Sequence, residues 1–184
     1  LLDKSRGWGI HYPFLDAFYP NPKIICMVRD PVDIFCSMER NLRNPGLVKP
    51  EKMLNTSLEK RLDYWSNSDP VGLALEHLQD ILRQGIDQQM LFIRYEDLCL
   101  HPQQELDRFY AYLGIESYPH HDFNKVEQIT QEDDRVYEIF GDHKINSKVS
   151  LEPSQALDVL GKSLCDKIRR RYSWLYERFG RSHS

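Results

Sequence analysis

Arg29 and Ser37 are the residues whose types and spacing first suggest chemistry, because together they could bind an anion. A guanidinium presents a planar fork of donors to phosphate oxygens, and a hydroxyl adds a neutral donor. Asp30 can cap a following helix and Pro31 suits the first position of that helix, whose amino end favours negative charge. The alternative is that Arg29 forms a surface ion pair and Ser37 only packs, and a short pattern alone does not separate the two.

An apolar run at residues 23–28 predicts the strand that would position Arg29. The run is continuous and rich in β-branched residues, which is typical of a central parallel strand covered on both faces. The helix predicted after it carries Ile34, Phe35 and Met38 at helical spacing. Open α/β sheets bind ligands beyond the carboxyl ends of their strands. Since Arg29 directly follows this strand, it lies where an anion would be held.

This strand, arginine and helix resemble a family motif. Arg29, Pro31 and Ser37 are similar to the residues with which sulfotransferases hold the 3′-phosphate of their donor, 3′-phosphoadenosine-5′-phosphosulfate (PAPS). In that family an arginine ends a strand, a serine lies eight residues later in the next helix, and both contact the 3′-phosphate. The resemblance therefore implies that Arg29 and Ser37 bind this phosphate.

Asp3 and Lys4 are the candidates for catalysis. The segment DKS at residues 3–5 resembles the Glu-Lys-Ser form of the acceptor site in the heparan-type branch of the family, with Asp in place of Glu. The resemblance implies that Asp3 takes the proton from the acceptor, although its side chain is shorter and a base must come within hydrogen-bond distance. The cytosolic branch has histidine where this chain has Arg6, which cannot act as a base near neutral pH. A local ion pair between Asp3 and Lys4 is the alternative.

The glycine-rich phosphate loop of the family does not occur in these 184 residues. Sulfotransferases carry it near the amino end, in a form such as PKSGTTW, where it cradles the 5′-phosphosulfate. We therefore expect the chain to be the carboxyl-terminal part of a longer protein. A lysine of that loop, with Lys4, would stabilise the charge that develops on the donor phosphate. His11 and Glu39 are weaker alternatives to Asp3 as the base.

A second strand is predicted at residues 89–94, and the segment that follows it carries the longest resemblance to the family. Its sequence, YEDLCLHPQQELDRFYAYLGI, is similar to the family's YEDL, proline and amphipathic helix ending in FLGI. Family members place this tyrosine beside the donor nucleotide, so the resemblance implies a nucleotide contact for Tyr95. Glu96 and Asp97 are expected to fix the turn and to cap nearby backbone groups.

A late segment, IFGDHKINSKV at residues 139–149, resembles the basic loop with which the family closes over the 3′-phosphate end of the donor. The resemblance implies that Lys144 and Lys148 supply the positive charge. The alternative is that both lysines are only solvated, as is usual for a loop with two lysines.

Apolar spacing and capping residues predict the remaining helices. They are expected at residues 10–19, 56–67, 70–83, 102–113 and 163–179. The first should turn Phe14, Leu15 and Phe18 toward the core, and Thr56 should cap the second. Residues 41–55 are expected to form a loop.

Composition limits the class of protein. A net charge of −4 does not indicate a general attraction to nucleic acid or anionic membranes.

No apolar run approaches a membrane span and no signal segment opens the chain, so we expect a cytoplasmic protein. The sequence leaves open whether a signal or anchor precedes residue 1. The histidines show no zinc spacing, so no metal is expected. Reduced, buried thiols are expected for the four cysteines, Cys26, Cys36, Cys99 and Cys165.

Strands that alternate with helices predict an α/β fold, a parallel sheet flanked by helices. The resemblance implies the P-loop NTPase-like sulfotransferase fold, incomplete at its amino end, in one domain over residues 1–184. It implies a PAPS-dependent transfer of a sulfuryl group to an unidentified hydroxyl or amine acceptor, with 3′,5′-diphosphoadenosine as product. The alternative is a nucleotide-binding or interaction module without turnover. A P-loop kinase relative would need a Walker-type loop and magnesium carboxylates. The oligomeric state stays open.

Overall fold

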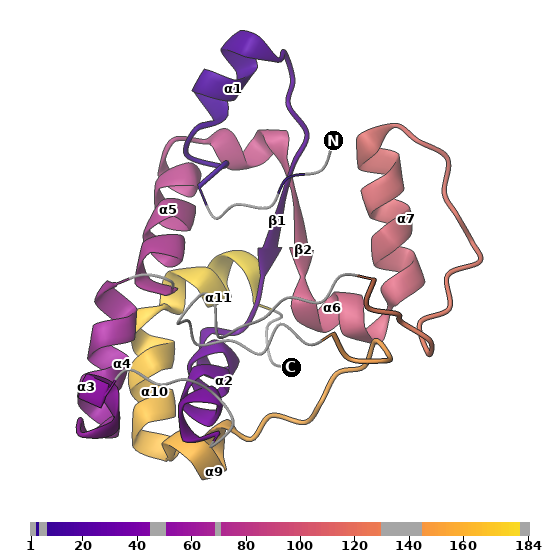
Figure 1. Cartoon of the computed structure of the whole chain (residues 1–184). Coiled ribbons are helices and arrows are strands. Elements are labelled where there is room, and N and C mark those ends of the chain that lie inside the picture. The colour runs from indigo at the N-terminus through magenta and orange to yellow at the C-terminus, as the bar shows by residue number, and fades with distance from the viewer. Residues whose placement is uncertain (1–2, 4–6, 45–50, 69–70, 130–144, 181–184) are drawn as a thin grey trace. The chain divides into compact units, whose positions relative to one another are not determined.

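In the computed structural model, the two apolar runs predicted as strands pair in parallel (Figure 1). Strand β1 covers Ile24–Val28 and strand β2 covers Met90–Arg94. Their register aligns the last residue of β1, Val28, with the last residue of β2, Arg94. The prediction of a parallel sheet is therefore confirmed to within one residue at each strand, and the chain has a mixed α/β architecture.

Arg29 and Tyr95 both follow this ladder directly in sequence, so the chain leaves the sheet toward both residues at the same carboxyl edge. The expectation that β1 would be covered on both faces is wrong in one respect. The Met27 side chain is 51% exposed, and β2 is the one strand neighbour of β1 in the part of the chain that the structure describes.

The described residues group into two compact units. One unit comprises Leu1–Val28 with Asp63–Pro119, and the other comprises Arg29–Leu62 with His120–Ser184. Within these bounds the structure describes residues 3, 7–44, 51–68, 71–129 and 145–180. The single domain expected over residues 1–184 stays a prediction.

The core of the first unit lies where β2 meets α5 (Val71–Arg83) and the short 3-10 helix η1 (Ile86–Gln89). Between these two helices Gly85 has a φ of 70°, a left-handed conformation that favours glycine and ends α5. The core side chains are those of Tyr12, Ile81, Ile86 and Met90.

The first helix, α1, covers Tyr12–Phe18 and buries a different side chain from the expected ones. Tyr12 joins the core, whereas Phe14 and Phe18 are 62% and 77% exposed and contact each other. A helix of seven residues can bury only a narrow stripe of side chains, and in α1 the buried side chain is that of the first helical residue, Tyr12.

Tyr112 holds the amino ends of the two strands together. It lies on α7, which covers Pro102–Leu113 and ends at Gly114 with a φ of 71°. Its hydroxyl accepts a hydrogen bond from the backbone N–H of Ile24 at 3.2 Å and donates one to the carbonyl of Gln89 at 2.8 Å. The ammonium of Lys23 lies 4.8 Å from the centre of its ring. Tyr112 thus satisfies backbone groups at the start of both strands.

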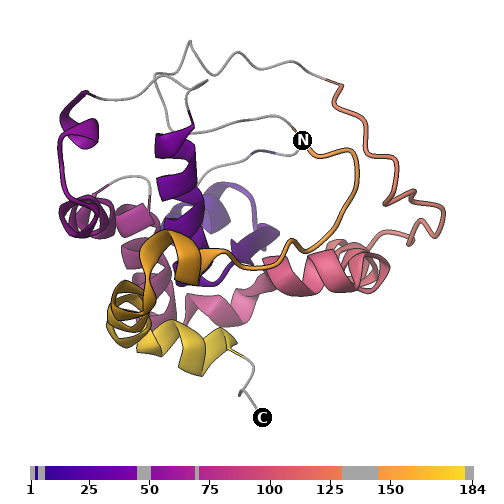
Figure 2. The ribbon, with the colours of Figure 1, turned by 90° about the horizontal axis from the view of Figure 1, so that it is seen from below.

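In the second unit, α2 (Pro31–Arg43) packs against α9 (Ala156–Leu160) and α10 (Lys162–Arg171), as Figures 1 and 2 show. The Phe35 ring of α2 stacks on the ring of Tyr172, with the ring centres 5.9 Å apart. The buried face of α2 consists of Pro31, Val32, Phe35, Cys36, Met38, Glu39 and Leu42.

Three helix boundaries differ from the prediction. The expected helix at residues 163–179 is two helices, α10 and α11 (Ser173–Phe179), because the backbone leaves helical geometry at Tyr172 with φ −111° and ψ 29°. The expected loop at residues 41–55 contains the end of α2 and a short helix, α3 (Glu51–Leu54). Helix α4 covers Leu58–Asn67, and the hydroxyl of Ser57, not of Thr56, accepts from the Lys60 N–H at 3.4 Å.

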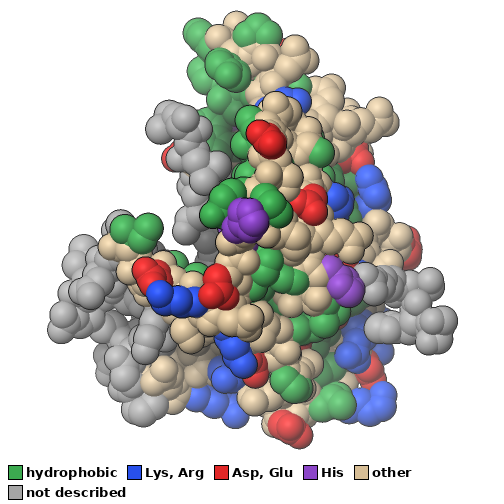
Figure 3. All heavy atoms as spheres, turned by 90° about the vertical axis from the view of Figure 1, so that its right-hand side faces the viewer, with side chains coloured by type: hydrophobic (Ala, Val, Ile, Leu, Met, Phe, Trp, Pro, Cys, Tyr) green, Lys and Arg blue, Asp and Glu red, His purple; other side chains and the backbone are tan. Residues whose placement is uncertain are grey.

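Surface charge is mixed over the face that Figure 3 presents. Acidic and basic side chains are interspersed there among apolar and neutral ones, and they do not gather into a field of one sign among the described residues. Within the described ranges, no helix has the length and apolar character that crossing a membrane requires.

The core of the first unit gives a prediction. Ile81→Ala should lower the free energy of unfolding by about 3 kcal/mol, because Ile81 is 5% exposed and its loss leaves a cavity between Tyr12 and Met90. Leu73→Ala is the matched control on the same helix. Leu73 is 42% exposed, so its loss should cost less than about 1 kcal/mol. Urea unfolding measures both, and equal losses would contradict this assignment of the core.

Candidate functional site

The amino end of α2 is built around the side chain of Asp30. Its Oδ1 atom accepts a hydrogen bond from the backbone N–H of Val32 at 2.8 Å, and its carbonyl accepts from the N–H of Ile34 at 3.0 Å. Pro31 occupies the first helical position, where the absence of an N–H costs nothing. The predicted cap and the predicted role of the proline are both confirmed.

Arg29 directly precedes this cap, and Ser37 lies in the middle of α2. Arg29 is half-buried between the last residue of β1 and the cap, and Ser37 is half-buried inside α2. Ser37 follows Asp30 by seven residues. Seven residues are about two helical turns, so Ser37 lies on the same side of α2 as Asp30, two turns further along the helix. The proposed contact of Arg29 and Ser37 with a phosphate stays a prediction.

Two hydroxyl groups from the carboxyl-terminal part of the chain hold the acidic side chains at the start of α2. The Tyr176 hydroxyl donates to Oδ1 of Asp30 at 2.6 Å, and the Ser154 hydroxyl donates to the carboxylate of Asp33. Burial, and then the Asp30 carboxylate, raise the pKa of Tyr176. Sequence reasoning missed both hydroxyls, because they lie 146 and 121 positions away from their partners and no local pattern marks them.

Tyr95, in the first unit, is the first residue of α6 (Tyr95–Leu100) and is half-buried. Arg94, the last residue of β2, pairs with Glu96 at 3.7 Å and with Asp97 at 3.5 Å. That these two acidic residues also cap backbone groups of the turn stays a prediction. The start of α6 is thus held to the end of the strand by ion pairs, which fixes the position of the Tyr95 backbone.

Of the two catalytic candidates, Asp3 lies within the described residues and Lys4 lies outside them. The Asp3 side chain is exposed, and its Oδ2 atom accepts a hydrogen bond from the indole Nε1–H of Trp8. His11, an alternative base, is exposed and precedes α1 without a side-chain capping bond. An exposed, oriented carboxylate is compatible with proton transfer, but its role stays a prediction.

Lys148 lies in a segment that two backbone hydrogen bonds hold in place. The N–H of Val126 donates to the carbonyl of Ser147 at 2.7 Å, and the N–H of Val149 donates to the carbonyl of Phe123 at 2.8 Å. The backbone around Lys148 is therefore fixed while its side chain is exposed. Lys144 lies outside the described residues.

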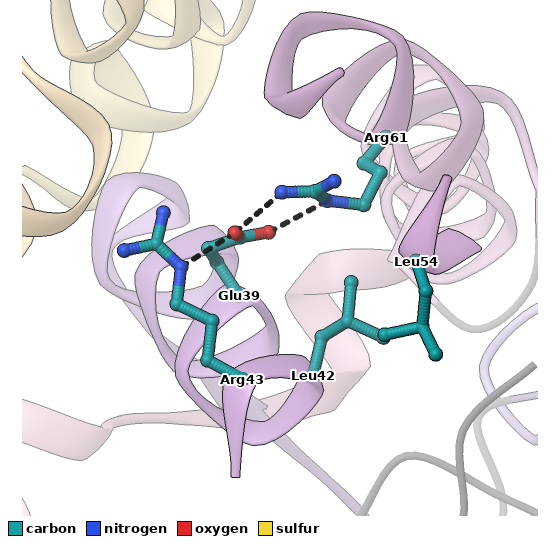
Figure 4. Close-up of a pocket in the computed structure, with 5 residues that line it drawn as sticks. All are labelled: Glu39, Leu42, Arg43, Leu54 and Arg61. Carbon is teal, nitrogen blue, oxygen red and sulfur yellow. Dashed lines mark hydrogen bonds and ion pairs between the residues drawn. The ribbon is translucent and has the colours of Figure 1, made fainter. Parts of the chain in front are cut away.

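Glu39, the other alternative base, lies in an ion-pair cluster of the second unit. Figure 4 shows the guanidinium groups of Arg43 and Arg61 converging on its carboxylate. Arg61 donates to both carboxylate oxygens, at 2.9 and 2.6 Å, and Arg43 donates to one at 2.8 Å. Arg61 also donates to the backbone carbonyls of Met53 and Thr56. Because the Glu39 side chain is fully buried and accepts three charged hydrogen bonds, the structure argues against its role as a base.

A cavity of about 320 Å³ adjoins this cluster (Figure 4). Its walls are formed by Glu39, Leu42, Arg43, Leu54 and Arg61. Since the guanidinium groups turn toward Glu39 and backbone carbonyls, the cluster joins α2 to the segment before α4. We therefore assign it a role in stability.

Burial keeps the thiols of Cys26, Cys36 and Cys165 in their unreactive form. Burial raises the pKa of Cys26 to about 11 and also raises the pKa values of Cys36 and Cys165. All three thiols thus stay protonated near neutral pH, and thiolates are the reactive form. The prediction of buried thiols holds for Cys36 and Cys165, while Cys26 and Cys99 are half-buried.

Comparisons with known proteins place this geometry in context. The family model described as "Sulfotransferase domain" matches residues 11–158, a range that includes Arg29, Ser37 and Tyr95 and begins after Asp3. The chain is 26% identical over 122 residues to "Cytosolic sulfotransferase 14" of Arabidopsis thaliana, covering 62% of this chain and 34% of that protein. It is 28% identical over 114 residues to "Carbohydrate sulfotransferase 4" of Mus musculus, covering 59% of this chain and 29% of that protein. The aligned part spans about a third of each relative. No solved structure matches at the same level of significance.

The Glu39 cluster gives a prediction about stability. Glu39→Gln should lower the free energy of unfolding by about 3 kcal/mol, because it leaves the Arg61 guanidinium, 12% exposed, without its charged partner. The matched acid-to-amide control is Asp80→Asn. Asp80 pairs with Arg83 at 3.3 Å on the surface of α5, where such a pair contributes about 0.5 kcal/mol. Urea unfolding measures both variants. The assignment would be contradicted if Glu39→Gln lowered the free energy of unfolding by no more than Asp80→Asn does.

Proposed function

The chain belongs to the sulfotransferase domain family, and we propose that it forms part of a PAPS-dependent sulfotransferase. The enzyme transfers a sulfuryl group to a hydroxyl or amine acceptor. The proposal includes the P-loop NTPase-like fold of the family, formed as a single domain and completed by a glycine-rich loop outside this sequence. It also includes a cytoplasmic location. It requires no metal, no nucleic acid partner and no membrane span in these residues.

The observation that carries the proposal is the arrangement at the carboxyl edge of the parallel ladder. The family match covers the strand, the cap and the helix that bear Arg29 and Ser37, and it extends through the second strand to Tyr95. Val28 and Arg94 end the two strands in register. Ligands of open α/β sheets bind beyond such an edge, which supports a nucleotide site there.

The residues at the start of α2 fit a phosphate group. Arg29 brings a guanidinium to the end of the strand, Ser37 adds a hydroxyl, and the helix dipole favours negative charge at this end. The carboxylates of Asp30 and Asp33 would oppose an anion. Each of them accepts a hydrogen bond from a distant hydroxyl, Tyr176 or Ser154, which restricts the direction of the carboxylate.

Each candidate then has one role. Arg29 and Ser37 hold the 3′-phosphate of the donor, and Tyr95 contacts the nucleotide. Lys144 and Lys148 close over the 3′-phosphate end as part of the late basic loop.

The reaction breaks the bond between sulfur and the donor's bridging phosphate oxygen and forms a bond from sulfur to the acceptor atom. Asp3 takes the acceptor's proton, and Lys4 stabilises the charge that develops on the departing 5′-phosphate. The product is 3′,5′-diphosphoadenosine. Positioning and electrostatic stabilisation supply most of the rate enhancement, as in phosphoryl transfer.

The acceptor is not assigned to one compound class. One relative is named for a cytosolic and the other for a carbohydrate sulfotransferase, and the identities to the two are similar. A nucleotide-binding module without turnover would share the 3′-phosphate site. Nucleotide binding and turnover therefore need separate measurements.

The first test is of nucleotide binding by the protein expressed from its complete coding sequence. Arg29→Ala should weaken the binding of 3′,5′-diphosphoadenosine by about 2 kcal/mol, because a charge-assisted contact to the 3′-phosphate is lost. Ser37→Ala should cost about 1 kcal/mol for one hydroxyl donor. Adenosine 5′-phosphate, which lacks the 3′-phosphate, should bind poorly and be nearly indifferent to Arg29→Ala.

Calorimetric titration of both nucleotides measures these differences. The matched control is Arg40→Ala, an exposed arginine of the same helix, which should leave both affinities unchanged. Equal losses for the two nucleotides in Arg29→Ala would show that Arg29 supports the fold or the 5′ end, and the assignment of the 3′-phosphate site would be wrong.

The second test concerns the base. Asp3→Asn should lower turnover by about 10² or more while leaving the affinity for 3′,5′-diphosphoadenosine unchanged, because the amide keeps the shape without the basicity. Sulfation of acceptors with labelled PAPS measures turnover, and Asp158→Asn, an exposed acid of α9, is the control. Near-normal turnover of Asp3→Asn would move the role to His11 or to a residue outside this sequence.

A further inference from the structure

The Asp30 carboxylate holds two elements of the second unit together through one atom. Its Oδ1 accepts from the Val32 backbone N–H at 2.8 Å and from the Tyr176 hydroxyl at 2.6 Å. The first contact is the helix cap, and the second comes from α11, the last helix described. The Tyr176 hydroxyl thus adds a second donor to the atom that caps the helix, and it restricts the direction of the carboxylate.

The direction of this carboxylate matters because Asp30 is the neighbour of Arg29 in sequence. A carboxylate close to a bound phosphate repels it, and a carboxylate that turns toward a guanidinium competes with phosphate for the same donors. By holding Oδ1 at the first turn of α2, Tyr176 limits the second effect, the rotation of the carboxylate toward a guanidinium.

The surrounding packing makes Tyr176 a fixed donor. The Phe35 ring of α2 stacks on Tyr172, the residue between α10 and α11, and α2 packs against α10. In a similar contact, the Ser154 hydroxyl donates to the carboxylate of Asp33, the next acidic residue after Asp30. Burial and the Asp30 carboxylate raise the pKa of Tyr176, so its hydroxyl keeps its proton and donates throughout the neutral range.

We propose that Tyr176 is a positioning residue for the 3′-phosphate site. Its hydroxyl fixes Asp30 as the cap of α2 and so sets the local charge and backbone that Arg29 and Ser37 present to the phosphate. This inference rests on the proposed function. It assigns to a residue outside the family match, which ends at residue 158, a part in discriminating nucleotides that carry a 3′-phosphate from those that lack it.

The test compares two tyrosines of the same region. Tyr176→Phe removes the hydroxyl that donates to Asp30. Tyr172→Phe removes a buried hydroxyl that has no hydrogen-bond partner among the described residues. The readout is the discrimination ratio, the Kd of adenosine 5′-phosphate divided by the Kd of 3′,5′-diphosphoadenosine. Calorimetry on the protein expressed from its complete coding sequence measures both Kd values.

Tyr176→Phe should lower the discrimination ratio by about fivefold or more, since a hydrogen bond to a charged group is lost. Tyr172→Phe should leave the ratio unchanged. In the Arg29→Ala background the effect of Tyr176→Phe on the ratio should largely disappear, because both residues act on the same phosphate contact. If Tyr176 had a purely structural role, Tyr176→Phe would lower the melting temperature and weaken the binding of both nucleotides equally, leaving the ratio unchanged.

The outcomes separate the two proposals. If the parent protein shows no preference for the 3′-phosphate, or Arg29→Ala leaves the ratio unchanged, the proposed 3′-phosphate site is wrong and the inference on Tyr176 falls with it. If the parent discriminates and Arg29→Ala abolishes the discrimination, but Tyr176→Phe keeps the parent ratio, only the inference on Tyr176 is overturned. An equal fall in the ratio for Tyr172→Phe would overturn it as well.

Discussion

The parallel ladder between β1 and β2 is the constraint on which the candidate site depends. It ends both strands at the same level, Val28 opposite Arg94, so the residues that follow leave the sheet at one edge. A slip of one residue would turn every side chain of a strand to the opposite face. Tyr112 opposes such a slip, because one hydroxyl bonds the backbone at the start of β1 and just before β2.

Two carboxylates at or in α2, a half-buried one at Asp30 and a fully buried one at Glu39, are the second feature that shapes this helix, and different donors hold each of them. At the start of α2, Asp30 accepts from a backbone N–H and a hydroxyl, which are neutral donors. Two turns later, Glu39 is fully buried and accepts from two guanidinium groups. Burying an unpaired carboxylate would cost several kcal/mol, so both arrangements constrain where α2 lies. The ion pairs of Glu39 anchor the second half of α2.

The secondary structure that positions the site was largely predictable. Continuous apolar runs predicted both strands, and a capping acid followed by proline predicted the start of α2, because these signals are local. Two features were not predictable from local patterns. A short helix such as α1 offers two equally apolar faces, and the sequence does not indicate that Tyr12 would be buried instead of Phe14 and Phe18. The break at Tyr172 lies where its ring stacks on Phe35, a contact that no local pattern contains.

By itself, then, the sequence determined the residue types that can bind a phosphate, their spacing and the elements that carry them, since neighbours in the chain settle these. It also carried the family resemblance, which the family model supports. Only the tertiary structure decided which polar groups meet across long separations. It placed Tyr176 on Asp30 and Ser154 on Asp33, and it committed Glu39 to Arg61 and Arg43. The physical reason is that hydrogen bonds and ion pairs depend on distance in space, and more than a hundred residues separate Asp30 from Tyr176 along the chain.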